Sequence, residues 1–223
     1  MKEKECLNHY FSLMQQRPQL FEDSDIISIV KDRNLIESFI NETGARIGVI
    51  YRSKYNCWVV DLVYDQKGNL YTYERVIPAA NGRGIVCIPI YKGNYILLKQ
   101  YRHAIRNTQI CFPRGYGENC ISSHDNTIKE IYEEIGATIN KIYKIGEISA
   151  DSGLSSGIAD IYVCDVESYS ADRCDEGILE MVLYSHNALK KMIEQGEIND
   201  GFTLGAFAML ECRGEWFSTL YPE

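Results

Sequence analysis

The spacing of apolar positions predicts one helix followed by a small strand-rich region at the start of the chain. Residues 4–16 repeat apolar side chains at helical spacing and stop near Pro18, so we expect an amphipathic helix there. The turn sequence at 65–69 predicts a hairpin between two of the runs that follow. The expected inner face of the helix is Cys6, Leu7, Tyr10, Phe11 and Met14; the expected strands are 26–30, 46–52, 57–64 and 70–76, with a short helix over 34–41.

Longer apolar runs in the rest of the chain predict a mixed sheet between helices. Residues 84–91 are almost continuously apolar, which is typical of a strand covered on both faces. Strands that bracket one central helix, with more helices at the end, indicate an α+β fold or α/β/α sandwich. We expect a β-rich N-terminal domain over 1–80 and a larger domain over 81–223. The larger domain's expected strands are 84–91, 95–105, 142–150, 158–167 and 178–185, and its closing helices are 186–196 and 201–213.

The central helix of the second region has one acidic face and one apolar face. Ser122, with Asp125 three residues later, predicts its start, and Gly136 predicts its end. At about 100° per residue, three glutamates fall together and four apolar residues fall opposite them. The acidic face holds Glu130, Glu133 and Glu134, and the face expected to be buried holds Ile128, Ile131, Tyr132 and Ile135.

Three carboxylates on one helix face indicate either a metal site or a solvated acidic surface. Like charges repel and raise one another's pKa unless something positive intervenes. Mg²⁺ binds through a few carboxylates together with substrate phosphates. Because the helix follows a Gly-containing loop, we interpret the acidic face as a site for Mg²⁺ or Mn²⁺ in phosphate chemistry. A solvated helix face is the alternative.

Charge and composition narrow the classes of function. The chain has 223 residues and a formal net charge of −8, which argues against a general nucleic-acid binder. No apolar run reaches the roughly 18 residues of a membrane span, and the first residues lack a signal-peptide core. The eight cysteines are scattered without metal-binding spacing, so we expect reduced thiols in a cytoplasmic protein.

The stretch from Gly115 to Ala137 resembles the Nudix box, whose opening glycine and closing Arg-Glu and Glu-Glu pairs have a fixed spacing. Two positions depart from that pattern. Ile121 stands where the family has a glutamate, and Lys129 where it has an arginine. In the family those two side chains pair and hold the metal-binding helix in place. We hypothesise that Glu118 reaches Lys129, or the metal, instead.

Further segments resemble the ADP-ribose pyrophosphatase branch of the Nudix family: ILLKQYRHAI, CFPRGYGEN, the run over 148–166 and INDGFTLGAFAML. Together they cover about residues 70–213. The resemblance implies a Nudix fold and Mg²⁺-dependent hydrolysis of the pyrophosphate bond in a nucleoside diphosphate linked to another moiety. ADP-ribose or a nucleotide sugar is the expected substrate, with a nucleoside monophosphate and a sugar phosphate as products. The N-terminal region is similar to the segment through which such enzymes dimerise, so we expect a homodimer.

The resemblance also assigns roles to the acidic helix. Glu130 and Glu134, one helical turn apart, are the expected main metal ligands, and Glu133 is a further ligand or a proton acceptor. The backbone carbonyl of Arg114 would supply one more oxygen. Glu118 is a further candidate ligand.

The general base is the least determined role. In ADP-ribose-cleaving relatives it is often a Glu on a loop after the box, but the matching place here, near Gly157, has no carboxylate. Asp175 and Glu176 are the next candidates, with an exposed acidic turn as the alternative. Glu133 can also serve as the base without them.

Arginines are the expected contacts for substrate phosphates, because a guanidinium binds phosphate oxygens in a bidentate way. Arg102 is the first candidate, and Arg114 and Arg75 are further ones. For Arg102, pairing with a neighbouring carboxylate is the alternative.

Two classes of function stay open from the sequence. One is a pyrophosphohydrolase, which the intact set of three glutamates favours. The other is a catalytically weak Nudix domain that binds a nucleotide or a protein partner, which Ile121, Lys129 and Gly157 favour. Another Nudix substrate, such as a damaged nucleoside triphosphate or a dinucleoside polyphosphate, is a third possibility.

Overall fold

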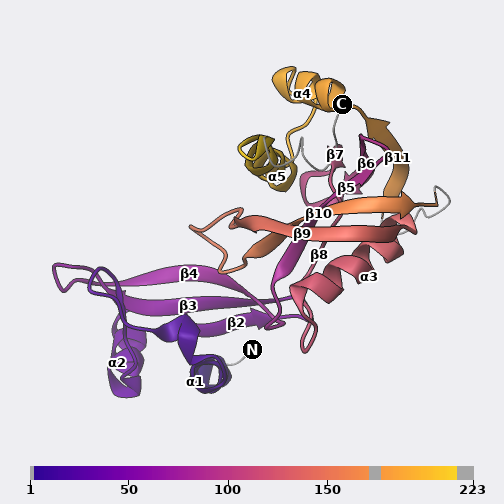
Figure 1. Cartoon of the computed structure of the whole chain (residues 1–223). Coiled ribbons are helices and arrows are strands. Elements are labelled where there is room, and N and C mark those ends of the chain that lie inside the picture. The colour runs from indigo at the N-terminus through magenta and orange to yellow at the C-terminus, as the bar shows by residue number, and fades with distance from the viewer. Residues whose placement is uncertain (1–2, 171–176, 215–223) are drawn as a thin grey trace. The chain divides into compact units, whose positions relative to one another are not determined.

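The computed structural model describes residues 3–170 and 177–214, and the chain divides into two compact units (Figure 1). The first unit comprises Met1–Ala80 together with Asp151–Gly157, and the second comprises Asn81–Ala150 and Ile158–Glu223. The main division therefore falls between residues 80 and 81. The return of a seven-residue segment to the first unit was not predicted from the sequence.

The first unit is an antiparallel sheet with helices on one face. Strand β3 pairs with β1, β2 and β4, and Figure 1 shows α1 and α2 on the same face of that sheet. The elements are α1 (Glu3–Gln16), a 3-10 helix (Pro18–Phe21), β1 (Ser28–Ile29), α2 (Arg33–Thr43), β2 (Gly48–Arg52), β3 (Asn56–Tyr64) and β4 (Leu70–Pro78). The hairpin predicted at 65–69 is confirmed, because β3 and β4 pair directly across it.

The core of the first unit lies between the helices and the sheet. Tyr10 and Ile36 are fully buried there, and Leu13 is buried where Phe11 and Met14 are only partly covered. The buried face of α1 therefore includes most of the predicted residues, but it is turned slightly toward Leu13 and away from Phe11 and Met14. Asp61 is a buried acid in this core, and it accepts a hydrogen bond from the Tyr10 hydroxyl at 2.5 Å.

The seven-residue segment 151–157 is hydrogen-bonded to β4. The Val76 N–H donates to the Leu154 carbonyl at 2.7 Å, and the Ser156 N–H donates to the Val76 carbonyl at 3.0 Å. The Tyr73 hydroxyl also donates to the Gly153 carbonyl at 2.8 Å. These bonds make the segment an added edge of the first unit, although its neighbours in sequence belong to the second.

The second unit is a mixed sheet between helical layers. Its strands follow the order β11-β6-β5-β10-β9, with β7 paired to β6 and β8 to β5; β10 and β5 are parallel and the other pairs antiparallel. The elements are β5 (Gly84–Tyr91), β6 (Asn94–Arg102), a 3-10 helix (His103–Ile105), β7 (Asn107–Cys111), β8 (Arg114–Gly115), α3 (Ser123–Ile135), β9 (Thr138–Ile148), β10 (Ala159–Ser168), β11 (Ile178–Tyr184), α4 (His186–Glu194) and α5 (Gly201–Glu211).

Each face of this sheet has its own apolar core. Ile131 and Ile135 of α3 pack on one face, and Leu189 of α4 and Phe207 of α5 pack on the other. Figure 1 shows α3 on one side and α4 with α5 on the opposite side. The predicted α/β/α arrangement with a mixed sheet is therefore correct.

Three strand predictions need correction. The strand expected over 26–30 is reduced to Ser28–Ile29. The strand expected over 95–105 stops at Arg102, because a 3-10 turn follows and Arg106 has a positive φ of 55°. The strand expected over 142–150 starts earlier, at Thr138, so the chain enters β9 almost directly from α3. Among the described residues, no helix is long and apolar enough to cross a membrane.

Candidate functional site

Helix α3 begins and ends where its capping residues predict. The Ser122 hydroxyl accepts a hydrogen bond from the Asp125 N–H at 3.0 Å, which satisfies one of the free N–H groups of the first turn. Gly136 adopts the left-handed conformation with φ 59°, and its N–H donates to the Tyr132 carbonyl at 3.0 Å. The helix bounds are thus set by local chemistry that can be read from the sequence.

The buried face of α3 is narrower than the apolar pattern predicts. Ile131 and Ile135 are fully buried, but Ile128 is 43% exposed and Tyr132 is 56% exposed. The prediction was therefore wrong for these two residues. The N-terminal part of the helix instead buries Asn126, whose side-chain amide donates to the Tyr116 carbonyl at 2.9 Å. This polar contact fixes the helix against the preceding loop, at a position that hydrophobic spacing does not identify.

Two of the three glutamates converge on the short strand β8. The Arg114 N–H donates to Glu134 Oε2 at 3.2 Å. A Cβ placed on Gly115 would lie 2.0 Å from Glu130 Oε1, so the carboxylate of Glu130 occupies the space that a side chain at 115 would fill. Both carboxylates therefore lie against the same two residues of backbone, and only glycine at 115 leaves room for this arrangement.

The third glutamate of the face is placed differently. Glu133 Oε2 lies 4.0 Å from Lys129 Nζ, and the Glu133 side chain is 53% exposed. The Lys129 ammonium also forms an ion pair with Glu118 Oε1, which bridges α3 and the loop before it. Pairing with Glu118 raises the Lys129 pKa above its ordinary value. The hypothesis that Glu118 reaches Lys129 is thus confirmed by the geometry.

The donor chemistry at β8 fits a hard divalent cation. Glu130 and Glu134 offer carboxylate oxygens, and the carbonyl of Arg114 belongs to the same stretch of backbone. Within residues 3–170 and 177–214, no three His, Cys, Asp or Glu side chains are gathered into a metal-binding cluster. The cluster of three carboxylates expected from the sequence is thus not gathered, and Glu130, Glu134 and the Arg114 carbonyl are the oxygens that could hold a metal, with substrate oxygens and water completing its coordination.

The side chain of Arg114 is held on the α5 side of the strand. Its Nη1 lies 3.3 Å from Asp200 Oδ1, and its guanidinium lies over the Phe202 ring at 4.8 Å from the centroid. Asp200 is buried and also caps α5 through the Thr203 N–H at 3.0 Å. The sequence predicts only that Asp200 starts a helix. No local signal in the sequence indicates that it also pairs with Arg114.

Arg102 retains hydrogen-bonding capacity in a partly buried position. Its Nη2 donates to the Cys111 thiol at 3.2 Å, whereas its Nε is buried and has no hydrogen-bond partner in the described structure. A buried guanidinium N–H without a partner is unfavourable unless water or a ligand meets it. Among residues 3–170 and 177–214, no carboxylate forms an ion pair with Arg102 within 4.0 Å, so pairing of Arg102 with a carboxylate stays an untested alternative.

Arg75 lies in the first unit and has partners there. Its Nε donates to Asp61 Oδ2 at 2.6 Å and its Nη1 to the Leu20 carbonyl at 2.6 Å, with the guanidinium over the Phe21 ring. These contacts give Arg75 a role in the core of the first unit, so we do not include it among the proposed substrate contacts.

The candidate general bases after the box are Asp175 and Glu176. Asp175 and Glu176 lie outside the described residues. Gly157 belongs to segment 151–157 of the first unit. The identity of the base therefore stays a prediction, with Glu133, Asp175 and Glu176 as its candidates.

Comparisons with known proteins support the fold. No family model matches the chain. An ADP-ribose pyrophosphatase of Bacillus subtilis (strain 168) is 25% identical over 126 residues, which are 55% of this chain and 68% of that protein. A crystal structure of an ADP compounds hydrolase matches with a TM-score of 0.66 at 18% identity, over 78% of this chain and 93% of the other. The structural match confirms the predicted α+β fold.

Proposed function

We propose that this chain is a hydrolase that cleaves the pyrophosphate bond of an ADP compound, with ADP-ribose as the first substrate to test. The observation that carries the proposal is the convergence of Glu130 and Glu134 on the backbone of β8. The names of the two similar proteins, an ADP-ribose pyrophosphatase and an ADP compounds hydrolase, support the choice of substrate. The products from ADP-ribose would be AMP and ribose 5-phosphate.

The proposed cofactor is Mg²⁺ or Mn²⁺, held by Glu130, Glu134 and the carbonyl of Arg114. Such an ion would neutralise charge on the phosphate oxygens, lower the pKa of a bound water and steady the leaving phosphate. The carboxylate of Glu134 is oriented for this role by the Arg114 N–H. Because Gly115 has no side chain, Glu130, one helical turn before Glu134, can approach the same strand.

Other residues of the chain would bind the substrate and move the proton. The unpartnered Nε of Arg102 is a suitable donor for a phosphate oxygen, and its guanidinium charge would offset the net negative charge of the protein. Glu133 has a half-exposed carboxylate on the acidic helix and is the proposed proton acceptor, with Glu176 as the alternative.

The altered box is proposed to keep its support through a different pair. The family's glutamate and arginine are Ile121 and Lys129 here, and Lys129 pairs with Glu118 from the same loop. A lysine–glutamate pair joins the loop to α3 as the family pair would. This arrangement favours an active enzyme over a domain whose catalytic helix has lost its support.

The proposal is tested by turnover assays on the purified protein with Mg²⁺ or Mn²⁺. The panel contains ADP-ribose, nucleotide sugars, dinucleoside polyphosphates and nucleoside triphosphates, and a phosphatase converts monophosphate products to measurable phosphate. Glu134→Gln removes one proposed metal ligand, and Glu194→Gln on exposed α4 is the matched control. We expect turnover of ADP compounds, abolished by chelation and by Glu134→Gln but kept by Glu194→Gln.

Two results would overturn the proposal. If Glu134→Gln keeps the turnover of the parent protein, Glu134 is not a metal ligand. Absence of turnover over the whole panel, with a nucleotide still raising the melting temperature, would favour the binding module instead. We also propose that the N-terminal region forms a homodimer, and light scattering after size-exclusion chromatography would contradict this if it gave the mass of one chain.

A further inference from the structure

A cluster of charged and hydroxyl side chains in the second unit surrounds the buried Asp160. We call it the Asp160 cluster, and it comprises Asp160, Arg83, Lys144, Ser123 and Tyr162. Asp160 Oδ1 accepts from Arg83 Nε at 2.7 Å and lies 3.0 Å from Lys144 Nζ. Asp160 Oδ2 accepts from the Ser123 hydroxyl at 2.6 Å, and that hydroxyl lies 2.8 Å from the Tyr162 hydroxyl.

The burial of Asp160 makes these contacts necessary. Its side chain is only 2% exposed, and an ionised carboxylate removed from water is costly unless it is paired and hydrogen-bonded. Burial alone would raise the Asp160 pKa, but the hydrogen bonds from Ser123, Lys144 and Arg83 outweigh it and lower the pKa. The Arg83 and Lys144 side chains are 39% and 45% exposed, so both cations keep part of their hydration.

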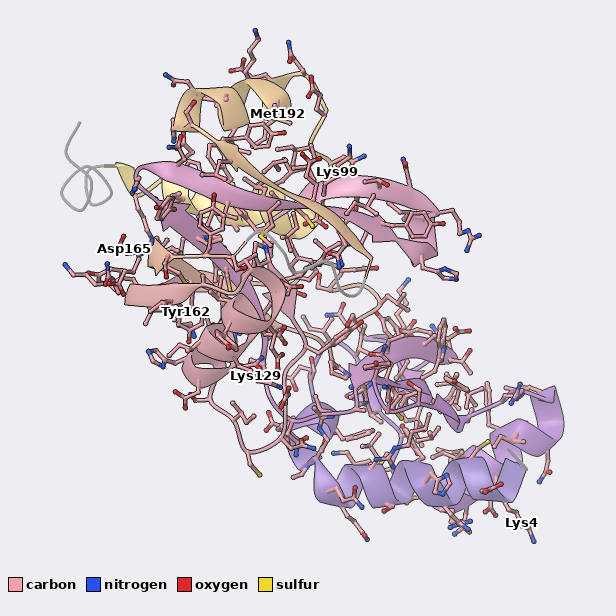
Figure 2. All side chains as sticks on the ribbon, turned by 90° about the vertical axis from the view of Figure 1, so that its right-hand side faces the viewer. Lys4, Lys99, Lys129, Tyr162, Asp165 and Met192 are labelled. Carbon is pink, nitrogen blue, oxygen red and sulfur yellow. The ribbon has the colours of Figure 1, made fainter. Side chains whose placement is uncertain are left out.

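The cluster joins the acidic helix to the sheet. Ser123 is the first residue of α3, whereas Asp160 and Tyr162 are on β10 and Lys144 is on β9. Tyr162 lies on the face of the sheet that α3 covers (Figure 2). Arg83 also forms an ion pair with Glu147 of β9, which connects the segment before β5 to the same array. The start of α3 is thus tied to the two strands at this edge of the sheet.

The far part of the same helix carries the carboxylates of the proposed site. Glu130 follows Ser123 by seven residues, which is about 10 Å along a helix. Ile131 and Ile135 hold that part through apolar packing, which has little directional preference. Lys129 also ties it to the preceding loop through Glu118, and Glu134 accepts a hydrogen bond from the Arg114 N–H. The Asp160 cluster ties the start of the same helix to β9 and β10, so it would contribute to the direction and rotation with which the carboxylates reach β8.

We propose that Asp160 is a positioning residue, which through Ser123 fixes α3 so that Glu130 and Glu134 meet the backbone of β8. This inference rests on the proposed function for its catalytic consequence, because the carboxylates matter there as metal ligands. When a residue that hydrogen-bonds to a metal ligand and orients it is removed, metal affinity or activity typically falls about 10- to 100-fold. Asp160 touches neither metal nor substrate in this proposal.

The test compares Asp160→Asn with Asp165→Asn, the same change on the same strand but outside the cluster. We expect Asp160→Asn to raise the Mg²⁺ concentration for half-maximal turnover about 10-fold or more. Asp165→Asn should leave it within about twofold of the parent protein. Two variants of Ser123 give a second test. Ser123→Thr keeps a hydroxyl and should retain the Mg²⁺ affinity of the parent protein. Ser123→Ala has no hydroxyl and should lower the Mg²⁺ affinity as much as Asp160→Asn does.

Hydrogen exchange gives a readout that does not depend on activity. Amides of residues 123–135 should exchange faster in Asp160→Asn than in Asp165→Asn, while amides of β5 and β10 stay as protected as before. Equal exchange of α3 in the two variants, or faster exchange over the whole unit, would overturn the inference. If Asp160→Asn does not fold, the Ser123→Ala and Ser123→Thr pair decides by the same measurement.

The two proposals fail in different ways. If the parent protein turns over no compound of the panel, the proposed function fails, and exchange in α3 still decides whether Asp160 positions the helix. If the parent protein is active but Asp160→Asn has the Mg²⁺ dependence of Asp165→Asn, the positioning role is refuted and the function stands.

Discussion

Replacing Gly115 by alanine should impair metal use without unfolding the protein. The added Cβ would lie 2.0 Å from Glu130 Oε1 and 2.2 Å from its carboxylate carbon. Gly115 does not have a positive φ, so alanine meets no backbone strain at this position. The conflict is with the end of a flexible side chain, which can move away at small cost to stability. The variant therefore displaces one proposed metal ligand selectively.

The size of that displacement follows from the contact distance. An ordinary contact begins near 3.4 Å, so the carboxylate of Glu130 has to retreat by about 1.4 Å. A misplacement of about 1 Å in a catalytic arrangement can reduce the rate about 100-fold. We therefore expect Gly115→Ala to lower kcat/KM for ADP-ribose by about 100-fold and to raise the Mg²⁺ requirement.

The assay is phosphate release over a range of Mg²⁺ concentrations, with the melting temperature measured in parallel. Gly201→Ala is the matched control, because a Cβ there meets nothing within 4 Å and Gly201 is in a helix of the same unit. It should keep full activity and gain a little stability from the better helix propensity. If Gly115→Ala has the kcat/KM and Mg²⁺ dependence of Gly201→Ala, Glu130 does not hold the metal at β8.

Three further predictions concern buried and paired groups. Tyr10→Phe removes a hydrogen bond to the buried carboxylate of Asp61, so urea unfolding should show a loss of about 1.5–3 kcal/mol. The Asp160 pKa is lowered on folding, so the unfolded chain binds a proton first as pH falls, and the unfolding free energy should decrease below about pH 5. Asp160→Asn should flatten this decrease. Restoring Glu at Ile121 together with Arg at Lys129 should change turnover little, because Lys129 already has a partner in the loop.

Each of these has a result that would contradict it. The control for Tyr10→Phe is Tyr51→Phe, which removes an exposed hydroxyl of the same unit. If both variants lose the same unfolding free energy, the hydrogen bond from Tyr10 to Asp61 does not stabilise the fold as predicted. Parallel acid-unfolding curves for the parent protein and Asp160→Asn would show that Asp160 does not titrate differently in the folded state. A large rise in activity of the restored double variant would show that the Glu118–Lys129 pair is a poor substitute.

Local chemistry explains why much of α3 was predictable. Its caps at Ser122 and Gly136 act on neighbouring backbone groups, so the sequence contains both ends of the interaction. The apolar spacing also gives the correct side of the helix, through Ile131 and Ile135. It does not give the width of the buried stripe, because that depends on which distant segments pack against the helix. Ile128 and Tyr132 therefore stay exposed.

Contacts between distant segments account for what the sequence did not reveal. Asp160 lies in the strand-like run IADIYVCDV, where an acid among apolar residues is a signal that a buried partner exists. Its partners are remote in sequence: Ser123 is 37 residues away and Arg83 is 77 residues away. The anchor of Arg114 on Asp200 is equally remote. The pairing of Glu118 with Lys129 was accessible because both residues belong to one loop and helix.

The return of residues 151–157 to the first unit limits how the chain can be divided. The polypeptide passes from one unit to the other three times, after residues 80, 150 and 157. A cut at residue 80 would remove β4 and leave the N–H and carbonyl groups of Leu154 and Ser156 without the Val76 backbone they bond to. The two units are consequently not interchangeable modules, since a gene fusion that transplanted either one as a continuous piece would carry an incomplete fold. No continuous segment of the gene encodes the whole of either unit without part of the other.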